Sequence, residues 1–439
     1  MKLQRIIFIY GLILFFGTEF SISQVNSDSL ISVYTKKIQK YLDKDNKASE
    51  VFSFTKTGIE VYSPATDSAQ KKFEYGIMWS ELDLFRELLS SLDTKTMVKL
   101  CRGKSDPFPE AIKTEYAGKS TSSVHPPVPS KKSLSGIRIA LDPGHIAGDL
   151  EAAKMEKKWV EMKNPPVELI EGELTLATAN ILKTKLEEQG AKVMLTRTKP
   201  GISSFGIDYK KWKDSLFVRA VAGAYERGDI DFEEKNYLLT KANDTEIFRR
   251  FFLLEDLRER AKKINEFHPD LTVVIHFNVD ETNSNWNKPT KKDYNMCFVG
   301  GGFTDDELEK PEDRLEFLRL LLTDDIERSV EFSTYMMESL VEKTGVPAAI
   351  DSNAVYLRDN CMDTEVKGVF CRNLTLTRKV NGVICYGESL YQDNINECRA
   401  LSKKEIKIDG METSKRVGDV AAAYLEGILN YVKNRKGNR

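Results

Sequence analysis

The chain has 439 residues, of which 41% are hydrophobic and 30% charged, and its formal net charge is −2. A chain of this length buries a sizeable core and has room for more than one domain. Lys and Arg are interspersed with Asp and Glu, and no basic excess indicates a nucleic-acid partner.

The first residues have the composition of a targeting signal. Lys2 and Arg5 precede the apolar run "IIFIYGLILFFG", which is too short to span a bilayer comfortably, and "SIS" follows with the small-x-small pattern of a cleavage site. Residues 1–23 are therefore predicted to be a secretory signal peptide, with an uncleaved membrane anchor as the alternative. No other apolar run is long enough to span a membrane, so we expect a protein of the bacterial periplasm or cell envelope.

Residues 25–102 are predicted to form a small α+β domain. A strand, a glycine-containing turn and a second strand are expected in "VFSFTKTGIEVYS", and "WSELDLFRELLSSL" has the spacing of an amphipathic helix. The segment contains no His, metal-ligand spacing or glycine-rich loop, which favours a structural or wall-binding module. Residues 103–135 are rich in Pro, Ser and Lys and are predicted to be a linker, with His125 as a solvated linker residue.

Strands alternate with helices over residues 136–435. Helical stretches separate strand-like runs, which are "IRIALD", "AKVMLTR", "DLTVVIHFN", "NMCFVG" and "GVICYGES". This alternation predicts an α/β fold with a mixed, mostly parallel sheet and helices on both faces. Two charge-rich insertions, near 198–255 and 281–325, interrupt the pattern and are expected to be solvated surface or lids over a site.

Two of the four histidines follow strand-like runs. His145 stands in "LDPGHIAGD" and His276 ends "DLTVVIH", whereas His268 is expected at the surface of a helix-to-strand connection. Ligands bind at the carboxyl ends of strands in open α/β sheets, so His145 and His276 can converge on one metal ion. The pattern alone fits two hydrogen-bonded structural histidines equally well.

Two carboxylates extend this candidate site. Glu171 stands just before the helix that follows the first strand, with Glu173 two residues further on, and a Glu there is often only a favourable charge beside the helix dipole. However, His, Glu and His are a known set of catalytic zinc ligands that leaves one coordination position for water. Glu388 follows the apolar run "GVICYG" and should face a cleft or a partner, because unpaired burial of a carboxylate is costly.

The stretch from about 136 to 431 resembles the zinc-dependent N-acetylmuramoyl-L-alanine amidases, the amidase-3 type of cell-wall hydrolase. That family has a "DPGHGG" strand end, a Glu before a helix and a "GxxVxxTR" strand, a strand ending in "SIHxN", and a "VE" strand end. The corresponding blocks here, in the same order, are "LDPGHIAGD", "EGELTLATANILKTKLEEQGAKVMLTR", "RAKKINEFHPDLTVVIHFN" and "GVICYGESLYQDNINE".

The resemblance implies roles for individual residues. It makes His145, Glu171 and His276 the zinc ligands, and it makes Glu388 the carboxylate that takes a proton from the attacking water and passes it to the leaving amine. The implied reaction is cleavage, in peptidoglycan, of the amide between the lactyl group of N-acetylmuramic acid and L-alanine of the stem peptide. Further positions that match the family, with structural or weaker implications, are Arg260, Asn278, Arg372 and Asn394.

The chain departs from the family pattern at several positions. Ile146 and Ala147 replace the glycine pair, Phe277 stands where a small residue is usual, and Gly387 replaces Val. These departures leave two alternatives open, which are a zinc amidase or peptidase acting on another envelope peptide, and a weakly active wall-binding or regulatory protein. We also expect an activator protein, with residues 307–322 as a lid over the zinc that the activator removes.

Overall fold

The computed structural model describes residues 27–64, 71–92, 94–104, 132–146, 148–163 and 166–437. The predicted signal peptide lies outside these residues, as do His125 and most of the predicted linker. Among the helices of the described part, none is long and apolar enough to cross a membrane.

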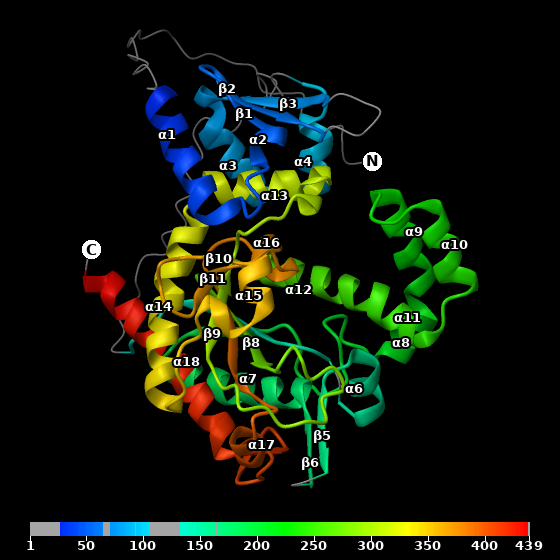
Figure 1. Cartoon of the computed structure of the whole chain (residues 1–439), viewed down its shortest axis with the longest axis vertical. Coiled ribbons are helices and arrows are strands. Elements are labelled where there is room, and N and C mark those ends of the chain that lie inside the picture. The colour runs from blue at the N-terminus through cyan, green and yellow to red at the C-terminus, as the bar shows by residue number, and fades with distance from the viewer. Residues whose placement is uncertain are drawn as a thin grey trace, which may run out of the picture.

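A seven-stranded sheet forms the centre of the molecule (Figure 1). Its order is β10-β11-β9-β12-β8-β4-β7; β12, β8, β4 and β7 run parallel, and β9 lies antiparallel to β12. The prediction of a mixed, mostly parallel sheet is therefore confirmed. The strands are β4 (Arg138–Pro143), β7 (Lys192–Leu195), β8 (Leu271–Asn278), β9 (Met296–Val299), β10 (Met362–Asp363), β11 (Val369–Cys371) and β12 (Ile384–Tyr391).

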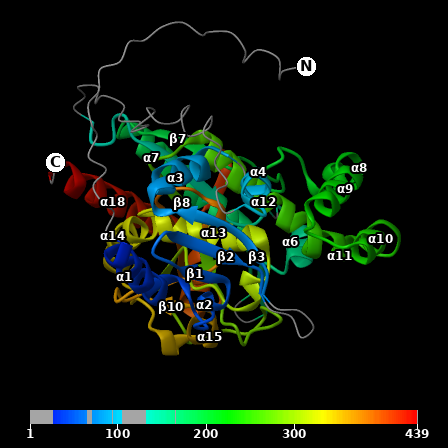
Figure 2. The same cartoon turned by 90° about the horizontal axis from the view of Figure 1, so that it is seen from above.

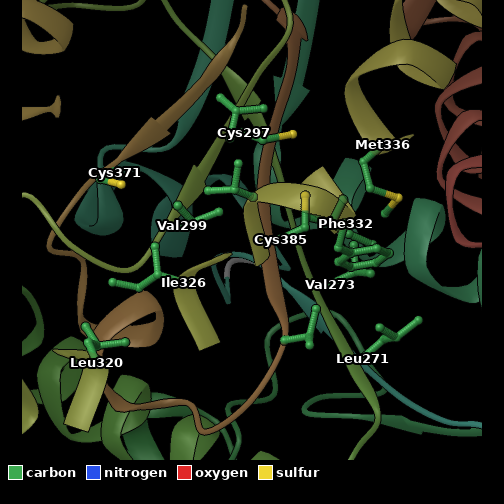
Figure 3. Packing of buried hydrophobic residues seen from close by; sticks show 14 of the residues in the cluster. Leu271, Val273, Cys297, Val299, Leu320, Ile326, Phe332, Met336, Cys371 and Cys385 are labelled. Carbon is green, nitrogen blue, oxygen red and sulfur yellow. The ribbon is translucent and has the colours of Figure 1, made fainter. Parts of the chain in front are cut away.

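Helices cover both faces of this sheet. All eight residues of β8 are buried, as expected of a parallel strand between two helical layers. Leu271 and Val273 belong to one hydrophobic cluster with Phe332 and Met336 of the helix 325–344, and Figure 3 shows Val273 close to Phe332. Val274 belongs to a different cluster, on the opposite face. The first face is covered by α7 (Glu171–Glu188), α14 (Asp325–Thr344) and α18 (Lys415–Gly437), and the second by α12 (Leu253–Phe267) and α16 (Thr375–Lys379).

The N-terminal region forms a small α+β unit with its own three-stranded sheet. The predicted hairpin is present, with β1 antiparallel to β2. Its core is continuous with that of the large sheet, since Tyr34 and Phe85 belong to one cluster with Leu318 and Val299, so the division into two domains stays a prediction. The elements are α1 (Ser27–Lys37), η1 (Ile38–Leu42), α2 (Ala48–Val51), β1 (Phe52–Phe54), β2 (Gly58–Tyr62), β3 (Phe73–Met78), η2 (Trp79–Glu81), α3 (Leu82–Ser91) and α4 (Thr94–Cys101).

The expectation that residues 307–322 form a lid over the metal site is wrong. They contribute α13 (Pro311–Leu322), which packs against α1, α3 and α4 of the N-terminal unit and against α16. Arg319 donates a hydrogen bond to the carbonyl of Val380, just before β12 begins. The helix therefore lies at the end of the sheet where the parallel strands start, opposite their carboxyl ends.

The insertion near 198–255 is a helical subdomain that projects from the side of the molecule (Figures 1 and 2). Trp212, Phe248 and Phe252 form its core, and Ile146, from the loop after β4, belongs to the same cluster. Ile146 therefore joins this insertion to the sheet. The elements are α8 (Tyr209–Ser215), α9 (Phe217–Arg227), α10 (Phe232–Thr240), α11 (Asp244–Ile247) and the π-helix η3 (Phe248–Phe252).

The remaining elements are short, and four of them form two small two-stranded sheets, β5 with β6 and β13 with β14. All six cysteines of the chain are buried and free. The elements are α6 (Leu150–Glu156), β5 (Trp159–Lys163), β6 (Pro166–Ile170), η4 (Asp306–Leu308), η5 (Asp351–Asn353), α15 (Val355–Asn360), α17 (Ile395–Leu401), β13 (Ile406–Ile408) and β14 (Met411–Thr413).

Candidate metal centre

The loop after β4 brings His145 against His276. A Cβ atom on Gly144 would lie 2.2 Å from the imidazole of His276, so only glycine fits at this position. His145 follows with φ of 60°, in the left-handed region, and the two imidazole rings meet edge to face with centroids 4.6 Å apart. The "PGH" sequence therefore allows the two imidazoles to meet at the carboxyl ends of β4 and β8.

Two buried arginines hold this loop by its carbonyl groups. Arg260 donates to the carbonyl of His145 at 3.1 Å and to that of Pro143 at 3.0 Å. Arg197 donates to the carbonyl of Gly144 at 2.9 Å. Arg260 thus lies near the site in a structural role, as its sequence match indicates, whereas the role of Arg197 was not predicted.

Glu171 completes a group of three potential metal ligands. It is the first residue of α7 and is 1% exposed. One of its carboxylate oxygens, Oε1, lies 3.1 Å from His145 Nε2 and 3.1 Å from His276 Nδ1. The ligand atoms of these three residues all lie within 4.8 Å of one another, and Glu173 is not part of the group. The three residues singled out in the sequence therefore meet at one point.

Burial and mutual charge set the protonation of this group. Burial lowers the pKa of His276 to about 4, so that its imidazole is neutral at physiological pH. Burial opposes ionisation of Glu171, but the neighbouring charges of His145 and Lys158 hold its pKa well below the ordinary value. A neutral imidazole and an ionised carboxylate are the forms in which these side chains bind metal.

Glu388 stands beside the group of three residues, on the strand next to the one that carries His276. It is the register partner of His276 in the parallel pair of β12 and β8, and Tyr386 stacks on the imidazole of His276 with centroids 4.7 Å apart. Burial, followed by the negative charge of Glu171, raises the pKa of Glu388 to about 7. A carboxyl group with such a pKa can both accept and return a proton near neutral pH.

The weaker sequence matches lie in supporting positions. Asn278 donates a hydrogen bond to the hydroxyl of Tyr356 at 3.1 Å. The guanidinium of Arg372 lies 4.8 Å from the centroid of the Tyr356 ring. Asn394 caps α17, because its side chain accepts hydrogen bonds from backbone N–H groups in the first turn of the helix. Each of them orders a loop near the carboxyl ends of the strands. His268 is exposed at the end of α12, as expected.

A cleft of about 160 Å³ adjoins Glu388. Lys158 and Trp286 form part of its wall, and the ammonium of Lys158 lies 5.0 Å from the Trp286 ring centroid and 3.8 Å from Glu171 Oε2. Neither Lys158 nor Glu156, which contacts His145, carries a signal in the sequence that marks it as a site residue. Both lie between the first strand and α7, in a stretch with no recognisable pattern.

Such a group of two imidazoles and a carboxylate, with a proton-accepting Glu beside it at the carboxyl ends of parallel strands, is the arrangement of a metal-dependent hydrolase. Residues 139–413 match the family model of the N-acetylmuramoyl-L-alanine amidases. Because the match covers more than half of the chain, the protein belongs to this family of amidase-3 enzymes and is a peptidoglycan hydrolase. No curated protein matches the sequence.

Solved structures of similar fold include several amidases. The CwlD amidase of Clostridioides difficile, solved in complex with the GerS lipoprotein, is 16% identical with a TM-score of 0.38, and the match covers 68% of this chain and 98% of that one. Ami1 of Mycobacterium smegmatis is 13% identical with a TM-score of 0.39, and the match covers 69% of this chain and 99% of that one. The catalytic domain of CwlV from Bacillus (Paenibacillus) polymyxa var. colistinus is 13% identical with a TM-score of 0.37, and the match covers 68% of this chain and 98% of that one. The family assignment rests on the family model alone.

Proposed function

We propose that His145, Glu171 and His276 hold a catalytic zinc ion and that Glu388 is the general base and acid of the amidase. The proposed reaction is hydrolysis of the amide between the lactyl group of N-acetylmuramic acid and L-alanine of the stem peptide. The observation that carries this proposal is the meeting of the three ligand atoms within 4.8 Å, next to the strand that bears Glu388.

The polar atoms at the centre of the group fit a metal ion. His145 Nε2 and Glu171 Oε2 are both buried and have no hydrogen-bond partner. Unpaired buried polar atoms are costly, and a cation between them would satisfy both. Two His and one Glu are a donor set of catalytic zinc sites, which keep one position open for water or substrate.

When zinc is bound at such a site, it lowers the pKa of water and polarises a carbonyl oxygen. The chain's own contribution is proton transfer at Glu388. Its carboxylate accepts a proton from the attacking water and then delivers it to the nitrogen of the leaving L-alanine. The raised pKa of Glu388 favours the first step, because a more basic carboxylate accepts the proton of water more readily, and the carboxyl group that results can then protonate the amine nitrogen.

The cleft beside Glu388 is the proposed place of the substrate. Lys158 is the cation of this wall. The acidic side chain of Asp280, in the same wall, already binds Thr290, Thr282 and Lys292. Stem peptides carry free carboxylates, and an ammonium held over an indole ring presents a fixed positive charge to them. We propose that Lys158 binds a stem-peptide carboxylate.

An amidase or peptidase that acts on a different envelope peptide is the second candidate. It is favoured by Ile146, which replaces a glycine of the family pattern and packs into the helical insertion next to His145. A weakly active wall-binding or regulatory protein is less well supported, because binding alone does not need the carboxyl group of Glu388.

Secretion into the periplasm or cell envelope, guided by residues 1–23, is also part of the proposal, since peptidoglycan lies outside the inner membrane. We further propose that an activator protein acts on this amidase. The solved complex of CwlD contains the GerS lipoprotein, which supports the presence of protein partners within the family.

Digestion of purified peptidoglycan by the mature protein, with and without a chelator, tests the proposed reaction. Mass spectrometry should detect stem peptides with a free L-alanine amine, and chelation should abolish them. Products cut elsewhere in the peptide would favour the second candidate. No products, despite one bound zinc ion per chain, would contradict the proposal for this substrate.

A further inference from the structure

Glu156 makes a buried contact with the proposed metal ligand His145. It is the last residue of α6, and its side chain is 2% exposed. Its Oε1 lies 3.0 Å from His145 Nδ1, and its Oε2 accepts a hydrogen bond from the backbone N–H of Ile146 at 3.1 Å. One carboxylate therefore holds both the ring of His145 and the backbone directly after it.

We propose that Glu156 is a positioning residue that fixes the tautomer and the orientation of His145. An ionised carboxylate only accepts hydrogen bonds, so His145 Nδ1 must carry the proton. When the ring is in its neutral form, which is the form that binds metal, its lone pair is then on Nε2, the atom that lies 3.1 Å from Glu171 Oε1. This contact presents Nε2 to the metal before the metal binds, as carboxylates behind metal-binding histidines do. The inference rests on the proposed metal site.

The helical insertion holds Glu156 in this place. Arg249, on the π-helix η3, donates hydrogen bonds to the carbonyls of Met155 and Lys154 at the end of α6. Ile146 anchors the other side of the contact, because its side chain is 3% exposed within the core of the insertion. The insertion thus supports the metal-ligand loop from behind, which gives the replacement of glycine by Ile146 a physical reason.

The isosteric variant Glu156→Gln tests the proposal sharply. A glutamine has one oxygen and one NH₂ group where Glu156 meets two donors. If its oxygen faces the N–H of Ile146, its NH₂ faces Nδ1 of His145 and favours the tautomer with the proton on Nε2. If the amide group is rotated by 180°, its NH₂ faces the backbone N–H of Ile146, and two hydrogen-bond donors meet there. In either orientation we expect zinc to bind more weakly.

The first measurement is the zinc dissociation constant of the full chain, by competition with a chromophoric chelator. Glu156→Gln is expected to weaken binding by about 10- to 100-fold, the usual effect of removing such a partner. Glu151→Gln is the matched control, since Glu151 is exposed on the same helix and should leave the affinity unchanged. Unchanged affinity in a folded Glu156→Gln protein would overturn the proposal.

The insertion is tested with Arg249→Gln, which removes the two donors to α6. Zinc affinity should fall in the same direction, and Arg250→Gln, whose side chain pairs with Glu234 at the surface, should leave it unchanged. If Arg249→Gln binds zinc like the wild type, the insertion has no part in positioning His145.

The second measurement is the tautomer itself, from the ¹⁵N imidazole resonances of the zinc-free protein at alkaline pH. His145 should carry its proton on Nδ1 in the wild type and shift towards the Nε2 form in Glu156→Gln. An Nε2 proton in the wild type would overturn the inference. Because this readout needs no metal, it remains decisive even if the wild type binds no zinc and the proposed function fails.

Discussion

Glu388 on β12 is the register partner of His276 on β8. Neighbouring strands lie about 4.8 Å apart, and residues in register on parallel strands point to the same face, so the two side chains stand side by side. Tyr386, two residues earlier on the same face, stacks on the imidazole of His276. The sheet thus fixes the separation between the proposed general base and the metal ligand, and no loop movement is needed to bring them together.

Glu388→Gln should keep the metal and lose the activity. The substitution preserves shape but removes the proton acceptor, so the rate of peptidoglycan hydrolysis should fall by about 10²- to 10⁴-fold. Zinc content, measured by elemental analysis, should stay at one ion per chain. Glu338→Gln, at an exposed position of α14, is the control and should hydrolyse at the wild-type rate. Full activity of Glu388→Gln would remove Glu388 from the mechanism.

Zinc should stabilise the fold as well as support the reaction. The buried atoms His145 Nε2 and Glu171 Oε2 make no hydrogen bond, so a cation that binds them only in the folded state is expected to raise Tm. At free zinc of about 100 times Kd the gain is about 2.7 kcal/mol. Differential scanning fluorimetry with added zinc should show this rise in the wild type and none in Glu171→Gln. An equal rise in both proteins would place the zinc elsewhere.

The sheet and its site could be predicted because strong physical patterns encode them. A parallel strand buried on both faces reads as a continuous apolar run, as in β8, and the carboxyl ends of such strands converge. These two rules indicate that His145 and His276 can converge, and the resemblance to the amidases is what selects this interpretation over two structural histidines. Glu156 escaped prediction because it comes from a short helix whose position depends on the distant insertion.

The location of α13 could not be predicted, because its composition suggests a solvated surface. Its charged residues are buried with partners that come from distant parts of the chain. Arg314 pairs with Glu74 at 2.6 Å, and Glu316 accepts a hydrogen bond from Thr94 at 2.7 Å. Charges can be buried when they are paired and hydrogen-bonded, and no local sequence pattern reveals partners more than 200 positions away.

Lys158→Gln should weaken substrate binding more than it slows the reaction. If Lys158 binds a stem-peptide carboxylate, its loss removes about one charge-assisted hydrogen bond and should raise KM for soluble muropeptides by about tenfold. Lys183→Gln, on the surface of α7 and paired only with Glu187, is the control. The prediction is contradicted if kcat falls while KM is unchanged. That result would mean that Lys158 stabilises the transition state instead of binding the substrate.

Gly387 stands where the family has Val, and the hydroxyl of Tyr424 occupies the space that a side chain at this position would need. A Cβ atom on Gly387 would lie 2.0 Å from this hydroxyl, which also makes a hydrogen bond of 2.9 Å with Ser389. Gly387→Ala should therefore destabilise the protein by about 1–3 kcal/mol, the cost of overpacking a core. Urea unfolding at equilibrium measures this cost.

A double-mutant cycle tests the cause. Tyr424→Phe removes the hydroxyl, so Gly387→Ala should cost less in that background than in the wild type. Gly418→Ala, in α18 itself, is the control. A Cβ there would lie 3.2 Å from the flexible end of the Ile406 side chain, which can move, and Ala is the better helix former, so this change should cost less than Gly387→Ala and cost the same in both backgrounds. If Gly387→Ala costs the same with and without the hydroxyl, then the close approach of Tyr424 is not what requires glycine beside Glu388.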